Sequence, residues 1–131
     1  MNKRNAKGAV VVELAVSLPV LLLVIFGTLE ICNMIKLKQS LTIAAYEGAI
    51  ISTIPGATAS DIQQASQQVL TDRGVNMGNV VVSPSNFQSQ PSGTAVTVTA
   101  NAMYSQNSVV LSGIFGTMNT QAKVVFMKDL D

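Results

Sequence analysis

The sequence predicts an α+β protein with one long N-terminal transmembrane helix, a short second helix and a small antiparallel sheet of about three strands. Two observations lead to this class. The apolar stretch at residues 9–35 contains only two charged residues, Glu13 and Glu30, whereas the remainder is rich in Ser, Thr, Asn and Gln. In that remainder the apolar residues recur first with a helical period and then with the alternation of a strand.

The composition fits one small domain attached to a membrane anchor. With 131 residues, a charged fraction of 11% and a mean hydropathy of +0.41, the chain is too apolar for an ordinary soluble domain. About 20 residues cross a bilayer, so residues 9–35 are long enough to span it. No A-x-A-like cleavage site follows promptly, unlike in a secretory signal. We therefore divide the chain into a basic leader and three further parts: 1–8, 9–35 (transmembrane), 36–53 (helix extension) and 54–131 (exported α+β domain).

Charge and residue inventory exclude several function classes. Three of the eight positive charges precede Ala9, which leaves five against seven negative charges in the rest of the chain. Nucleic acid is therefore not an expected partner, because its binding needs clustered Lys and Arg. The chain has no histidine and a single cysteine, Cys32, so we expect no internal disulfide, no catalytic residues, no metal site and no cofactor, and we do not expect an enzyme. Cys32 is either a small apolar residue of the anchor or a site of intermolecular disulfide formation.

A processing and assembly signature stands at the start of the anchor. Gly8 ends the basic leader, and Glu13 lies just inside the apolar helix, where a carboxylate is costly and indicates function. Cleavage after Gly8 would create an ammonium at Ala9, one helical turn before Glu13 on the same face. Glu13 could then pair with that ammonium or with the Ala9 ammonium of a neighbouring subunit. The alternative is that Glu13 merely reaches the cytoplasmic headgroups.

Over residues 8–49 the chain resembles the TadE-like pseudopilins of tight-adherence pilus systems, which are related to type IV pilins. The residues that carry the resemblance are Gly8, Val12-Glu13-Leu14, Pro19, Phe26-Gly27, Glu30, Gln39, Leu41, Ala44-Ala45 and Glu47-Gly48-Ala49. The resemblance implies a pilin-like subunit that is processed after Gly8 by a prepilin peptidase. It also implies other pilin-like subunits, the inner-membrane pilus assembly platform and the lipid bilayer as partners. The competing interpretation is an unprocessed single-pass binding or adhesin-like module.

The anchor has an expected direction and an expected irregularity. Lys3, Arg4 and Lys7 before it favour a cytoplasmic N-terminus and a periplasmic C-terminal domain in a bacterial inner membrane. Pro19 predicts a helix kink, because proline removes a hydrogen-bond donor and crowds the preceding turn. We expect Glu30 near the outer edge of the bilayer as a solvated or snorkelling carboxylate.

The first helix is expected to end near Ser52, just before the exported domain. Ser60 and Gln63 form a capping-box pattern for a second helix, which Gly74 ends. Three strands follow in the predicted order: 79–83, 96–104 and 118–127. The apolar patches Val109-Val110-Leu111 and Ile114-Phe115 are expected to cap the sheet.

Overall fold

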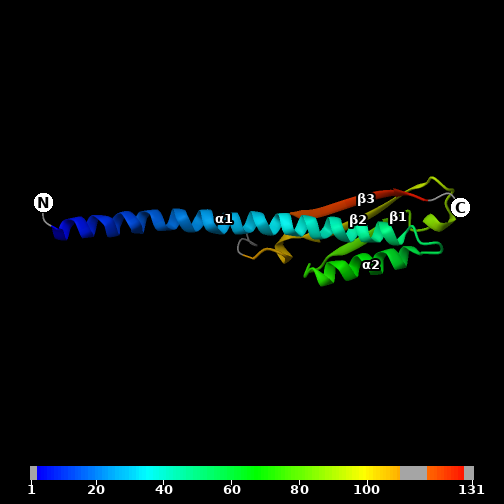
Figure 1. Ribbon diagram of the computed structural model, residues 1–131, viewed down its shortest axis with the longest axis horizontal. Helices are drawn as coiled ribbons and strands as arrows, with labels where there is room; N and C mark the ends of the chain where they lie inside the picture. The colour runs from blue at the N-terminus through cyan, green and yellow to red at the C-terminus, as the bar shows by residue number, and fades with distance from the viewer. Residues whose placement is uncertain (1–2, 110–117, 129–131) are drawn as a thin grey trace.

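The computed structural model describes residues 3–109 and 118–128, with side chains from Gly8 onward. A single long helix, α1 (Lys3–Ile51), runs through the molecule. Its first part projects alone, and its second part lies along a three-stranded sheet and the shorter helix α2 (Ala59–Asp72), as Figure 1 shows. The α+β class predicted from the sequence is confirmed.

Helix α1 contains 49 residues and is about 74 Å long. The backbone is helical on both sides of Pro19. The kink expected at this residue stays a prediction. Every side chain from Gly8 to Leu29 is exposed apart from the half-buried Gly27. We call residues 8–29 the projecting segment, because no other described part of the chain covers it.

From Glu30 onward, one face of α1 is buried with the spacing of a helical stripe. The buried positions are Glu30, Leu37, Ser40, Leu41, Ala44, Ala45, Gly48 and Ala49. The domain thus begins to pack on the helix at residue 30, within the stretch assigned from sequence to the membrane. Cys32, two residues further on, is exposed.

The N-cap of α2 lies two residues before the predicted cap, so the Ser60–Gln63 capping box is wrong. Thr58 is the N-cap: its hydroxyl accepts from the Asp61 N–H, and the Asp61 carboxylate accepts from the Thr58 N–H. The predicted stop at Gly74 is confirmed, since Gly74 has φ +68° and the Val75 N–H donates to the Leu70 carbonyl in a Schellman arrangement.

The sheet is antiparallel with the strand order β1-β2-β3, where β1 is Asn79–Ser83, β2 is Ala95–Met103 and β3 is Asn119–Met127. The three predicted strands are therefore present, with bounds that differ by at most one residue. Val82, Val98 and Val124 lie in one row across the sheet, on the face that packs against the helices. Of the apolar patches expected to cap the sheet, residues 110–117 lie outside the described residues, and Val109 is exposed.

The core lies between this sheet face and the two helices. Its fully buried members come from α1, from α2, and from β2 and the turn after it: Leu41, Ala44, Ala45, Ile62, Leu70, Val96, Val98, Ala100 and Tyr104. Gly48 lies where α1 and α2 approach closely, because a Cβ there would collide with Ser66 Oγ and stand 3.0 Å from Ile62 Cγ2. The second half of α1 is thus part of the domain core and also the continuation of the projecting segment.

Candidate functional site

The residues predicted for processing and assembly all lie on the projecting segment. Gly8, Ala9 and Glu13 are exposed, and a Cβ at Gly8 would meet nothing within 4 Å. Glu13 shares one face of α1 with the following residues: Gly8, Ala9, Val12, Val16, Ser17, Val20 and Leu21. No other described part of the chain packs there. The roles of Gly8, Ala9, Glu13 and Pro19 stay predictions.

The polar side chains of the projecting segment are adapted to an apolar environment. The Ser17 hydroxyl donates to the Leu14 carbonyl at 3.1 Å, and the Thr28 hydroxyl donates to the Val24 carbonyl at 2.8 Å. Bonds of this kind satisfy hydroxyl donors within the helix. Glu13 is therefore the residue of this segment whose charge most needs a partner.

A second polar site lies where the projecting segment ends. Glu30 is only 2% exposed, and its Oε1 accepts a hydrogen bond from the Tyr104 hydroxyl at 2.7 Å and another from the Ser108 hydroxyl. The Tyr104 oxygen also lies 3.2 Å from the Glu30 backbone carbonyl. We call Glu30, Tyr104 and Ser108 the junction cluster. The expectation of a solvated or snorkelling Glu30 is wrong, because the turn that follows β2 covers it.

Next to the junction cluster, the side chains of two asparagines form further hydrogen bonds between α1 and the domain. Asn33, one turn after Glu30, donates to the Asn107 carbonyl. The Asn107 side chain donates in turn to the carbonyls of Asn76 and Met103, and its Oδ1 accepts from the Asn76 N–H at 2.8 Å. These bonds connect α1, the segment after α2 and the end of β2 at one level along the helix.

The environment of Tyr104 keeps its hydroxyl protonated. Burial is the main cause that raises the pKa of Tyr104 to about 12, followed by its hydrogen bond to Glu30 and the charge of that carboxylate. Hydrogen bonds from Ser108 and Asn33 act in the opposite direction. A neutral phenol remains a proton donor to Glu30 over the physiological range, so the contact is a stable attachment of the domain to the helix.

Sequence reasoning noted Glu30 but missed its partners. A signal was present, because Glu30 lies 7, 11 and 14 residues before Leu37, Leu41 and Ala44 and therefore on the stripe that the domain covers. The alternation of the predicted strand 96–104 also places Tyr104 on the same side as Ala102, although β2 itself ends at Met103. No pattern links residues 30 and 104 directly, since 74 residues separate them.

No group of three or more His, Cys, Asp or Glu side chains that could hold a metal ion occurs in the described ranges, 3–109 and 118–128. Within the same ranges α1 is the helix long and apolar enough to cross a membrane, with a mean hydropathy of 2.7 in its most apolar stretch.

Comparison with known families gives one match. Residues 8–49 match the family model described as TadE-like protein, which confirms the resemblance inferred from the sequence. The match covers the projecting segment and most of the buried stripe of α1, including Glu30, and ends before α2 and the sheet. The comparisons with curated proteins and with solved structures gave no match.

Proposed function

Taking the TadE-like character of residues 8–49 as the premise, we propose that this chain is a pilin-like, membrane-anchored subunit of a tight-adherence or type IV-related pilus. In this proposal a prepilin peptidase removes residues 1–8. The projecting segment stays in the inner membrane, with the N-terminus cytoplasmic and the domain periplasmic, until the assembly platform adds the subunit to others. The role is structural rather than enzymatic.

The observation that carries the proposal is the isolation of the projecting segment. An apolar helix exposed on all sides is unstable in water and needs lipid or other helices around it. At about 1.5 Å per residue, residues 8–29 are about 33 Å long, close to the roughly 30 Å hydrocarbon core of a bilayer. The same surface, once it leaves the lipid, is available to the corresponding helices of neighbouring subunits.

Processing supplies the charge that assembly uses. Cleavage of the Gly8–Ala9 bond leaves an ammonium at Ala9, four residues before Glu13. In the low dielectric of packed helices, an ammonium attracts a carboxylate strongly and favours the register that brings the two together. Glu13 of one subunit and Ala9 of another are then complementary, and the uncut leader would separate them.

The test is the mass of the mature protein made beside its own peptidase. We expect the chain to begin at Ala9, and we expect Gly8→Leu to stay uncut while still entering the membrane. Neither Gly8 nor Gly27 has an atom within 4 Å of an added Cβ, so Gly27→Leu is a matched control that should be cut normally. Retention of Met1 in the unmodified chain would contradict processing and favour the unprocessed, adhesin-like module instead.

A further inference from the structure

The domain end that faces the anchor lies at the height of the lipid headgroups, if α1 is anchored as proposed above. The projecting segment is about as long as the hydrocarbon core is thick, so Glu30 falls at the boundary between acyl chains and headgroups. The bonds from Tyr104 and Ser108 to Glu30 hold the turn after β2 at that level. Val109, the next residue after Ser108, is 78% exposed there.

A small hollow of about 40 Å³ lies at this end, between α1, the end of α2 and the turn after β2. It is lined by Asn33, Lys36, Leu37, Ser40, Arg73, Gly74, Val75 and Asn107. Two of these residues, Lys36 and Arg73, are cations with exposed side chains. The hollow admits groups of the size of a water molecule or a phosphate oxygen, but not an acyl chain.

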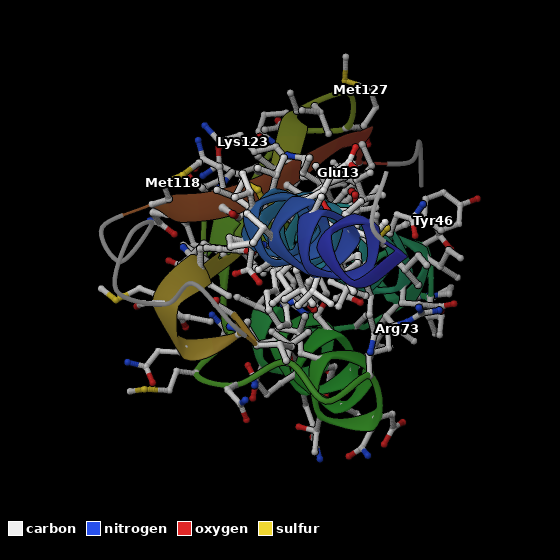
Figure 2. The ribbon with its side chains drawn as sticks, turned by 90° about the vertical axis from the view of Figure 1, so that its left-hand side faces the viewer. Glu13, Tyr46, Arg73, Met118, Lys123 and Met127 are labelled. Carbon is white, nitrogen blue, oxygen red and sulfur yellow. The ribbon has the colours of Figure 1, made fainter. Side chains whose placement is uncertain are left out.

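Both cations are placed to meet a group on the membrane side. Side chains on a helix lean toward its N-terminus, so Lys36 extends from α1 toward the bilayer. Arg73 caps the end of α2, which runs antiparallel to the lower part of α1, and Figure 2 shows it between the ribbons of α1 and α2. Neither cation has an ion pair within the described part of the chain. Two acids lie close to this end: Asp72 accepts a hydrogen bond from Gln68, and the Glu30 carboxylate accepts from Tyr104 and Ser108.

We infer that this hollow binds the headgroup phosphate of an anionic phospholipid, with Lys36 and Arg73 as the charged contacts. The exposed Val109 beside the junction cluster favours a lipid over a free phosphate ion, because it offers apolar surface where the acyl region begins. A bound headgroup would fix the domain against the leaflet from which α1 emerges. The inference rests on the membrane anchoring in the proposed function.

The experiment titrates the detergent-solubilised full chain with phosphatidylglycerol or phosphatidylcholine and counts bound lipids by native mass spectrometry. We expect a preference for phosphatidylglycerol that falls about fivefold for each cation replaced, and therefore more than tenfold in Lys36→Gln/Arg73→Gln. The matched control is Lys123→Gln/Lys128→Gln, which removes the same charge elsewhere: Lys123 lies across α1 from Arg73 in Figure 2, and Lys128 donates to the carbonyls of Gln88 and Gln90. The control should bind within twofold of the unmodified chain.

Three results would overturn the inference: no preference for phosphatidylglycerol, an equal loss in both double variants, or displacement of the lipid by inorganic phosphate. Flotation with phosphatidylcholine vesicles separates this failure from failure of the anchor itself. A chain that inserts into these vesicles but shows no headgroup preference retains its proposed anchoring, whereas a chain that does not insert contradicts the anchoring.

Discussion

Glu30 is buried although a carboxylate removed from water is costly unless hydrogen bonds compensate for its lost hydration. Hydroxyl groups of Tyr104 and Ser108 supply that compensation. Glu30 lies in the segment that matches the TadE-like family model, and Tyr104 lies outside it. Their hydrogen bond therefore connects the part of α1 that matches the family to the part of the domain that does not. Removal of one partner should therefore weaken the attachment of the domain, without affecting the projecting segment.

Tyr104→Phe tests this contact. We expect it to reduce the free energy of unfolding of the domain by about 1–3 kcal/mol, because a buried carboxylate loses a donor. Since the pKa of Tyr104 is raised to about 12 in the fold and is near 10 in an unfolded chain, its contribution is fully present below pH 10. It is lost as the pH rises toward 12.

The measurement is phenolate absorbance against pH, combined with urea unfolding at pH 8 and pH 11. The chain has two tyrosines, so the late ionisation should disappear in Tyr104→Phe and remain in Tyr46→Phe. Persistence of the late step in Tyr104→Phe would contradict the assignment of the raised pKa to this residue.

Glu13 is expected to matter for joining subunits and not for insertion. A carboxylate within an apolar helix opposes insertion by up to about 3 kcal/mol at the bilayer centre and by less near the interface. Glu13→Gln and Glu13→Val should therefore enter the membrane and be cut normally, but should fail to co-purify with other pilin-like subunits or to form surface filaments. Normal filaments from both variants would leave Glu13 as a residue that only reaches the headgroups.

At the scale of elements, the close approach of α1 and α2 depends on Gly48. Gly48→Ala should reduce the free energy of unfolding by about 1–3 kcal/mol, because its Cβ meets Ser66 Oγ and Ile62 Cγ2. The Ser66 hydroxyl has no hydrogen-bond partner among the described residues, so Ser66→Ala alone should be nearly neutral. In the double variant the loss should be smaller than in Gly48→Ala.

Urea unfolding followed by circular dichroism measures the three variants in one double-mutant cycle. Gly27→Ala, at a position with open space around it, is the control for adding a methyl group to α1, and it should not destabilise the domain. If Gly48→Ala is as stable as the unmodified chain, the helices can separate without cost and the packing described for this contact is wrong.

The sequence was sufficient to predict the elements, since each depends on local periodicity. Strands β1 to β3 follow from alternation, and α1 follows from an uninterrupted helical pattern. The start of α2 was misassigned because Thr58-Asp61 and Ser60-Gln63 both fit the capping-box spacing. The structure uses the first, which places the Asp61 carboxylate instead of the neutral Gln63 at the position that accepts from the N-cap backbone N–H. The helix dipole favours a negative charge there, and the Thr58 hydroxyl and backbone N–H lower the pKa of Asp61.

The junction cluster was beyond sequence reasoning for a different reason. Glu30 is fixed by contacts with residues 74 and 78 positions away, and no local pattern records which turn of the domain reaches the helix. Gly8, Ala9 and Glu13 present the opposite case: their proposed roles follow from spacing alone, and they are exposed, so the fold of the described residues adds no contact that bears on these roles.

At the scale of the whole molecule, the charges that flank the apolar stretch predict its orientation in a membrane. Because Lys3, Arg4 and Lys7 favour a cytoplasmic N-terminus, we expect a reporter fused after Asp131 to be active only if it is one that works outside the cytoplasm. Replacement of these three residues by Gln leaves Lys36 and Lys38 as the flanking charges and should reduce the correctly oriented fraction. Activity of a cytoplasmic reporter alone would reverse the proposed topology.

Because α1 passes from the projecting segment into the domain core without a break, a tilt of the whole helix in the proposed anchored state carries the domain with it. From Glu30 to Ile51 the helix is about 32 Å long. If the anchored part tilts by about 20°, a typical value for membrane-spanning helices, Ile51 moves sideways by about 11 Å. In the proposed assembly, the angle at which neighbouring helices hold the anchor would therefore determine where the outer tip of the domain is presented. A pull on that tip would act directly on the end of α1 that is proposed to lie in the membrane.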